Sequence, residues 1–297
     1  MVDRTAIRRW CQRRLGYPLE AAGVAVLFML FKALTLDRAS ALGGWIGRHV
    51  GPWLPPAATA RHNLRRAMPE LDHDERDRIL SAMWDNLGRT MAEYPHLRQI
   101  CRERVEVIGW DQLRGLVETP RTTLLFSGHF ANWEALPMVA DQRGLALASI
   151  YRRPNNPIVD RLLQGCRQTE TGHLFAKGRD GARQILATLR KGGTVAMLVD
   201  QKLNDGLAVP FFGRPAMTAP AIGQMAHLFH CPVLPARIER LAGARFRITI
   251  GDPVTFPETG NRAADLLAAM TLVNGTLEHW IRERPAQWLW IHRRWPD

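Results

Sequence analysis

The sequence predicts an α/β protein with a central mixed, mostly parallel sheet and helices on both faces, preceded by an N-terminal membrane-associated helical segment. Two observations support this prediction. The continuous apolar runs 122–127 and 194–199 are typical of strands that a parallel sheet buries on both faces. Longer segments elsewhere repeat apolar residues on one helical face, as Ile79, Met83 and Leu87 do at intervals of four.

The N-terminal segment, expected over residues 1–60, joins a basic start to the apolar run 21–31, which Lys32 interrupts. A full membrane span takes about 20 apolar residues. The run therefore either lies in the membrane interface or crosses it with Lys32 extended towards the headgroups. A buried core helix is a third interpretation. No signal-peptidase site follows, so we expect the segment to be retained. Five arginines form the basic start: Arg4, Arg8, Arg9, Arg13 and Arg14.

Residues 61–297 are expected to form the α/β domain. Two strands should follow the run 122–127, over 144–150 and 194–199, and the segment 245–250 alternates apolar and polar residues as an edge strand does. A helix is expected over 263–284, because Pro285 cannot continue it.

The overall charge indicates an anionic partner. Lys and Arg number 40 and Asp and Glu 28, an excess of 12 cations, which suits an acidic membrane, a phosphorylated ligand or nucleic acid. No nucleic-acid-binding motif is present, so we do not expect nucleic acid. The histidines show no metal-ligand spacing, and we expect no metal and no other cofactor. Scattered cysteines predict reduced thiols: Cys11, Cys101, Cys166 and Cys231.

The run 122–127 ends in a Ser-Gly pair, which predicts a strand, a turn, and a helix from about Phe130. His129 then lies at the carboxyl edge of the sheet, and Glu134 follows five residues later. Within one helix five residues advance about 500°, so the two side chains would point apart. With His129 in the turn, Glu134 can reach back from the second helical turn.

A paired histidine and carboxylate predict a general base. The carboxylate fixes the tautomer of the imidazole and raises its basicity, and the other ring nitrogen faces the substrate. The sequence has no Gly-x-Ser-x-Gly elbow, so we expect the hydroxyl of the substrate to be the nucleophile in a single-step acyl transfer. Alternatively, His129 caps a helix beside an unrelated surface Glu134.

Other polar residues follow the expected strands. Arg152 comes after the strand 144–150, and Asp200 and Gln201 come after the strand 194–199. Because parallel sheets bind ligands beyond the carboxyl ends of their strands, these residues are candidates for substrate binding, with Arg152 as an anion or oxyanion contact. Asp180 is a further candidate, although it also fits the N-cap of a helix.

Two aromatic segments each allow two interpretations. The run 209–215, Val-Pro-Phe-Phe-Gly-Arg-Pro, either contacts an acyl chain or membrane or packs internally. The terminal stretch 288–295 mixes tryptophans with arginines, so it either seats the domain on lipid and grips phosphates or packs its rings on the sheet.

The motif Gly-His-Phe-Ala-Asn-Trp-Glu at 128–134 resembles that of the lipid A late acyltransferases, the lauroyl/myristoyl transferases of lipopolysaccharide biosynthesis in Gram-negative bacteria, within the glycerolipid-acyltransferase-like superfamily. The Glu-Gly-Thr-Arg motif of the glycerolipid branch is absent, and Lys202 stands where some lipid A members have an acidic residue. Further matching blocks occur in the order of the family, at 151–157, 199–201, 211–215 and 284–295.

The resemblance implies transfer of a fatty acyl group from acyl carrier protein to the hydroxyl of a 3-hydroxyacyl chain on a phosphorylated lipid A precursor. It implies His129 as base, Glu134 as its partner, and Arg152 and Asn156 as substrate-binding residues. It also places the catalytic domain on the cytoplasmic face of the cell inner membrane. Because such a donor is cytosolic, we expect the N-terminal helix to lie on the membrane or to start outside.

Three other functions remain open at this point. A relative that acylates phosphatidylinositol mannosides or another phospholipid would share the same site. A non-catalytic protein that binds anionic membranes would need only the excess of cations and the terminal aromatic residues. A hydrolase would use water activated by His129.

Overall fold

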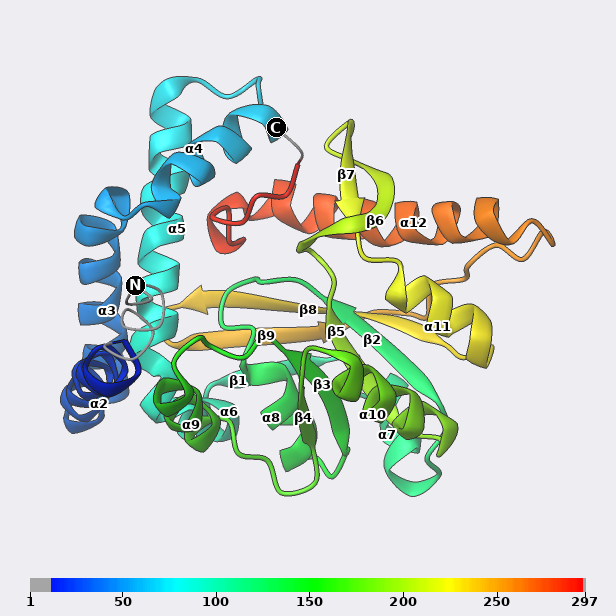
Figure 1. The fold of residues 1–297 in the computed structure, drawn as a ribbon, viewed down its shortest axis with the longest axis horizontal. Coiled ribbons are helices and arrows are strands. Elements are labelled where there is room, and N and C mark those ends of the chain that lie inside the picture. The colour runs from blue at the N-terminus through cyan, green and yellow to red at the C-terminus, as the bar shows by residue number, and fades with distance from the viewer. Residues whose placement is uncertain (1–11, 296–297) are drawn as a thin grey trace, which may run out of the picture.

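The computed structural model describes residues 12–295. Figure 1 shows a central sheet with helices on both faces and a block of helices at one end of it. The helical block opens with a π-helical turn, Gln12–Gly16, and includes two 3₁₀ turns, Gly51–Trp53 and Tyr94–His96. Its helices are α2 (Tyr17–Ala33), α3 (Leu36–Val50), α4 (Pro56–Ala67), α5 (His73–Glu93) and α6 (Leu97–Glu103).

Seven strands form the sheet, in the order β1-β9-β8-β2-β5-β3-β4. All neighbouring strands are parallel except β8 and β9. The predicted mixed, mostly parallel sheet is therefore confirmed. The bounds of the strands are β1 (Val105–Ile108), β2 (Thr123–Ser127), β3 (Leu147–Tyr151), β4 (His173–Ala176), β5 (Thr194–Leu198), β8 (Val233–Ala242) and β9 (Arg245–Ile250).

The expected strand over 245–250 is present as β9, but its position at the edge is wrong. β9 lies between β8 and β1, because β1 pairs with it in parallel and covers its outer side. Its apolar residues Phe246, Ile248 and Ile250 are buried, so the alternating pattern reports one buried face rather than an open edge.

Both faces of the sheet are covered, as predicted. Along β2, Leu124 and Phe126 belong to one apolar core and Leu125 belongs to the other, because successive side chains of a strand point to opposite faces. Figure 1 shows α11 and α12 on one side of the sheet and α6, α7 and α8 on the other. The remaining helices are α7 (Asp111–Glu118), α8 (Ala135–Gln142), α9 (Pro157–Cys166), α10 (Arg179–Arg190), α11 (Ala221–Phe229) and α12 (Arg262–Glu283), which is followed by a 3₁₀ turn, Pro285–Gln287.

Both aromatic segments pack internally. The run 209–215 lies in a hairpin of β6 (Lys202–Phe211) and β7 (Arg214–Thr218), and Phe211 is fully buried. In the terminal stretch, Trp288, Trp290 and Trp295 are at most 3% exposed and Arg294 is fully buried. The interpretation of this tryptophan stretch as a lipid seat is therefore wrong, because its rings complete the core around α12 and the hairpin.

The N-terminal helix is exposed along most of its length. Residues Gln12–Ala33 form the one helix within 12–295 that is long and apolar enough to cross a membrane, and only 11% of its apolar window is buried. The interpretation as a buried core helix is therefore wrong. Arg4, Arg8, Arg9 and Cys11 lie outside the described residues.

Helices α3 and α5 pack so closely that their backbones touch. A β-carbon on Gly47 would collide with the carbonyl oxygen of Trp84, and one on Gly88 would collide with the carbonyl oxygen of Gly43. A backbone atom cannot yield as a flexible side chain can. Glycine at these positions therefore sets the distance between the two helices, and thereby the position of α5 relative to α3.

We predict that Gly88→Ala destabilises the protein by about 1–3 kcal/mol, because the added methyl group overpacks a rigid contact. The control is Gly275→Ala in α12, where a β-carbon would meet no atom within 4 Å; it should be neutral or stabilising by up to about 1 kcal/mol. Thermal unfolding of both variants in detergent measures the difference. Equal effects of the two substitutions would contradict the close packing of α3 and α5.

Candidate active site

The site forms where two neighbouring parallel strands end. β2 and β5 pair in parallel, and Ser127 at the end of β2 lies opposite Leu198 at the end of β5. His129 and Asp200 each follow two residues later, so the register brings them to the same point of the sheet edge. The structure thus confirms the position of His129 at the carboxyl edge of the sheet.

Asp200 holds His129 at two points. One carboxylate oxygen lies 2.7 Å from His129 Nδ1, and the other accepts the backbone N–H of His129 at 2.7 Å. The second oxygen also accepts the indole N–H of Trp288 at 2.8 Å. Asp200 is 2% exposed. Burying a carboxylate is costly unless it is fully hydrogen-bonded, and these three donors meet that requirement.

The expectation that Glu134 accepts the hydrogen bond from His129 is not met. Glu134 stands at the N-cap of α8 rather than in a second helical turn. Its Oε1 accepts hydrogen bonds from Tyr94 at 2.7 Å and Trp133 at 3.0 Å, and it forms an ion pair with Arg167.

Helix α8 starts later than expected because of the turn that precedes it. Ala131 has a φ of 47°, a left-handed conformation that interrupts a helix. Its N–H donates to the carbonyl of Gln287, and the adjacent Phe130 forms a β-bridge with Trp288. The C-terminal tail therefore holds residues 130–132 in a turn, and the helix begins only at Ala135.

The charges around His129 favour its protonated form. Burial lowers the pKa of His129, but the charge and hydrogen bond of Asp200, with a smaller contribution from the charge of Glu134, raise it above the 6.5 of an ordinary histidine. The same pairing holds the pKa of Asp200 well below its usual range despite burial. An ionised Asp200 can only accept, so in the neutral ring of His129 the proton is on Nδ1 and Nε2 presents a lone pair.

Gln201 lies at that ring nitrogen, and His292 lies beside both residues. The amide nitrogen of Gln201 lies 3.3 Å from Nε2 of His129 and 3.3 Å from Nε2 of His292. The rings of the two histidines are 5.3 Å apart. Burial, together with the positive charge of His129, lowers the pKa of His292. A neutral His292 beside His129 suits a site in which one imidazole takes up a proton.

The other candidate residues have different positions. Arg152 is exposed and lies close enough to His292 to lower its pKa, so it stands at the rim of the site. Asn156 is buried and caps α9, and its amide donates to the carbonyl of Tyr17 and to Glu20. Its side chain is thus engaged in capping α9 and anchoring α2, and its role in binding substrate stays a prediction.

Asp180 also lies away from the site chemistry. Its side chain is 90% exposed and pairs with Arg183 in the first turn of α10. Gly178, not Asp180, occupies the N-cap, so the helix begins at Arg179, two residues earlier than the sequence suggested.

Several residues of the site escaped sequence reasoning. The bond from Trp288 to Asp200 and the approach of His292 to His129 depend on the path of the C-terminal tail, which no local pattern reveals. The pairing of Asp200 with His129 did have a signal: both follow the apolar strands by two residues. Neighbouring parallel strands with equal extensions bring such residues together.

Within residues 12–295, no group of three His, Cys, Asp or Glu side chains is placed to hold a metal ion. The prediction of a cofactor-free site remains a prediction. Cys101, Cys166 and Cys231 are free thiols.

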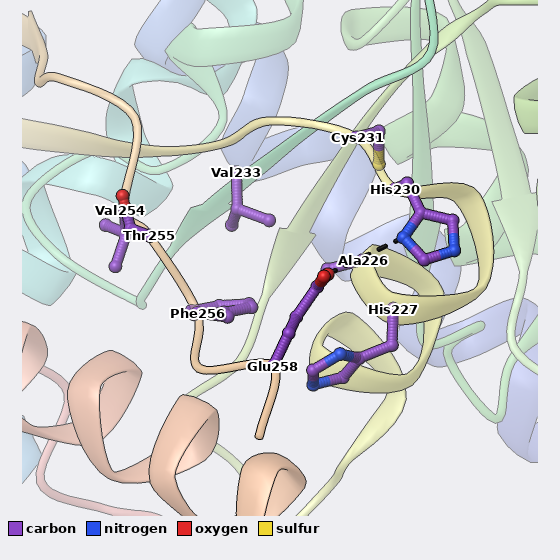
Figure 2. Close-up of a pocket in the computed structure, with 9 residues that line it drawn as sticks. All are labelled: Ala226, His227, His230, Cys231, Val233, Val254, Thr255, Phe256 and Glu258. Carbon is purple, nitrogen blue, oxygen red and sulfur yellow. Dashed lines mark ion pairs between the residues drawn. The ribbon is translucent and has the colours of Figure 1, made fainter. Parts of the chain in front are cut away.

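A cavity of about 480 Å³ lies away from this site, where α11 meets the start of β8 (Figure 2). Val233, which lines it, pairs with Leu124 near the amino end of β2. The cavity therefore opens at the opposite end of the strands from His129. Figure 2 shows His230 and Glu258, an exposed ion pair, at its wall.

The fold and the His129–Asp200 pair define an α/β protein with a histidine–carboxylate pair at the carboxyl edge of its sheet. Residues 7–297 match the family model of the bacterial lipid A biosynthesis acyltransferases. The chain belongs to this family, which makes it an acyltransferase of lipid A biosynthesis at the level of the family.

Individual relatives agree with this assignment. A lipid A biosynthesis palmitoleoyltransferase of Escherichia coli is 27% identical over 94% of this chain and 91% of its own length. A lipid A biosynthesis lauroyltransferase of the same organism is 25% identical over the same shares. A lipid A biosynthesis acyltransferase of Haemophilus influenzae is 24% identical over 84% of this chain and 78% of its own length.

We predict that Asp200→Asn lowers the pKa of His129, because the ionised partner that offsets burial is gone. The acid limb of the pH–rate profile for acyl transfer, which we expect above pH 6.5 in the wild type because the pKa of His129 is raised, should move to lower pH. The rate on the plateau should fall by about 10²–10⁴-fold. An acid limb unchanged in Asp200→Asn would show that Asp200 does not set the protonation of His129.

The same pair predicts a pH dependence of stability. Since the folded-state pKa of His129 is raised, its stabilising contribution is complete below pH 6.5 and is lost as pH rises through the folded pKa. The Tm of the wild type should therefore fall, relative to that of Asp200→Asn, as pH rises from about 6 to 9. Parallel Tm curves over this range would contradict the raised pKa.

Proposed function

We propose that this protein transfers a fatty acyl group from the thioester of an acyl carrier protein to the hydroxyl of a 3-hydroxyacyl chain on a phosphorylated lipid A precursor. One observation carries the proposal. Asp200 binds Nδ1 of His129 and leaves Nε2 as an acceptor at the carboxyl edge of the sheet. A base so arranged, in a member of this family, suits the activation of a hydroxyl.

The reaction needs no covalent enzyme intermediate. Nε2 of His129 removes the proton of the acceptor hydroxyl, and the hydroxyl oxygen attacks the thioester carbonyl. The resulting tetrahedral oxyanion collapses, the C–S bond breaks, and the ester C–O bond remains. The imidazolium returns its proton to the departing thiolate, which leaves as the free thiol of the carrier.

In this mechanism Asp200 orients the ring and stabilises the imidazolium. Glu134 adds to that stabilisation through its charge, which also raises the pKa of His129. Its ion pair with Arg167 and its bond from Tyr94 hold the carboxylate in place. The motif pair of His129 and Glu134 thus acts through the electric field, whereas the direct contact is made by Asp200.

The groups around Nε2 mark the place of the reacting atoms. The Gln201 amide, 3.3 Å from Nε2, occupies the position from which a substrate hydroxyl would donate, so substrate binding requires this amide to move aside. Once moved, its N–H group can face the oxyanion. Arg152 at the rim is a cation for the phosphates or the oxyanion, as expected from the sequence.

The N-terminal helices support a membrane surface as a partner. Leu19 is 71% exposed, Met29 62% and Trp53 87%. Other large apolar side chains are also exposed on the π-helical turn Gln12–Gly16, on α2, on α3 and on the segment that follows α3. They are Leu15, Val26, Leu27, Leu30, Leu42, Trp45, Val50 and Leu54. A lipid surface would cover them. We place the protein at the inner membrane, with the catalytic domain on its cytoplasmic face, where acyl carrier protein is present.

We predict that His129→Ala folds but loses at least about 10²–10⁴-fold in transfer rate, because the general base held by Asp200 is gone. The assay incubates the purified enzyme with a panel of acyl carrier protein thioesters and a tetra-acylated, phosphorylated lipid A precursor, and weighs the product by mass spectrometry. His279→Ala, an exposed histidine on α12, is the matched control and should retain full activity.

Near-normal transfer by His129→Ala would refute the mechanism. Free fatty acid without acylated lipid, made by the wild type, would identify a hydrolase. Lipid binding with no release of carrier thiol would identify a non-catalytic membrane-binding protein.

A further inference from the structure

The turn at residues 130–132 is held in an unfavourable backbone conformation. Ala131 is fully buried at a φ of 47°, and such a conformation costs on the order of 1–3 kcal/mol unless its surroundings impose it. The turn is tied to His129 directly, since the carbonyl of His129 accepts the N–H of Leu289 at 3.2 Å and the N–H of Ala131 donates to Gln287 at 2.9 Å. A shift of this turn would therefore move His129.

Side chains of helix α5 also bind this turn. Thr90 donates its hydroxyl to the carbonyl of Ala131 at 3.0 Å, and the Asn86 amide lies 3.4 Å from that oxygen. Glu93, at the end of α5, accepts the Asn132 amide at 2.9 Å. Three side chains of one helix thus bind two consecutive residues of the turn.

A buried ion pair joins these contacts. Glu93 is fully buried and pairs with Arg240 of β8, which is 8% exposed. Arg240 also donates to the side-chain oxygen of Asn86 at 2.8 Å and approaches Thr90 Oγ1 at 3.2 Å. Arg240 therefore contacts all three α5 side chains that bind the turn, which are Asn86, Thr90 and Glu93.

A buried ion pair such as this one adds little net stability. Desolvating two charges offsets most of their attraction, and an apolar pair of the same volume would serve a core equally well. A buried polar network instead fixes one arrangement of the groups that it binds. Here, these groups converge on the turn behind the base.

We propose that Glu93 and Arg240 are positioning residues that hold the turn 130–132 and thereby aim His129 at Asp200. The inference rests on the proposed role of His129 as the base. It adds two residues of α5 and β8, neither of which contacts the substrate edge, to the machinery of the reaction.

Glu93→Gln tests the proposal, because it keeps the shape of the side chain and removes its charge. The readout is an NMR titration of the histidine Cε1–H resonances in the full-length protein, which reports the pKa of His129 whether or not transfer is measured. Asp200 and Glu134 raise this pKa, and His292 is the neighbouring titrating ring. Glu93 is not among the charges that shift the pKa of His129, so any change would report geometry.

We expect the pKa of His129 to fall towards 6.5 in Glu93→Gln, since the bond to Asp200 is weakened. We also expect kcat to fall about 10- to 100-fold with little change in KM for the acyl donor, because displacing the base acts on the chemical step. Glu93→Asp should recover part of kcat. Asn132→Ala, which leaves the ion pair intact and removes the direct bond from the turn to Glu93, should change the titration in the same direction.

The matched control is Glu239→Gln. Glu239 is 9% exposed, lies next to Arg240 on β8 and pairs with Arg237 and Arg284. It should lose stability but keep the titration of His129 and kcat per folded molecule. The proposal is overturned if Glu93→Gln and Asn132→Ala retain the wild-type titration and lose activity only in proportion to the folded fraction. If His129→Ala remains active, the proposed function fails, while the titration still decides whether Glu93 positions the ring.

Discussion

The structure depends on the hydrogen-bonded pair of His129 and Asp200 at the ends of two adjacent parallel strands. The carboxylate is buried, so it must find donors, and it finds the ring and backbone of His129 and the indole of Trp288. Each donor comes from a fixed element: the end of β2 or the packed C-terminal tail. The cost of burying one charge therefore determines how the strand ends and the tail are arranged around the base.

The same sheet edge carries the apolar N-terminal helix. Asn156, which follows β3 at that edge, donates to the backbone of Tyr17 and to Glu20 in α2. Further along, the carbonyl of Phe31 lies 2.9 Å from the ring of His96. The helix whose apolar side chains are exposed is thus fixed beside the strand ends that present His129. This geometry suits an enzyme that acts on a lipid at a membrane surface.

Sequence reasoning found what depends on local pattern. The apolar runs predicted the strands β2 and β5, and the position of His129 after one of them predicted its place at the carboxyl edge of the sheet. It missed what depends on distant segments. Glu134 is the carboxylate nearest to His129 in the chain, but the C-terminal tail holds Ala131 in a turn before α8. The ring of His129 therefore pairs with Asp200 instead. Asn156 is a polar residue that follows a strand end, as a ligand contact would, but its side chain anchors α2. The sequence left open whether the terminal tryptophans contact lipid or pack internally, because α12 and the β6–β7 hairpin that bury them are distant in the chain.

The central claim, that Asp200 fixes the tautomer of His129, is tested most directly by the ¹⁵N chemical shifts of its two ring nitrogens. The protein would be labelled at histidine and measured well above the pKa of His129, with the resonances assigned by comparison with His129→Ala. The account predicts a protonated Nδ1 and an unprotonated Nε2. A proton on Nε2, with Nδ1 bare beside the carboxylate, would contradict it.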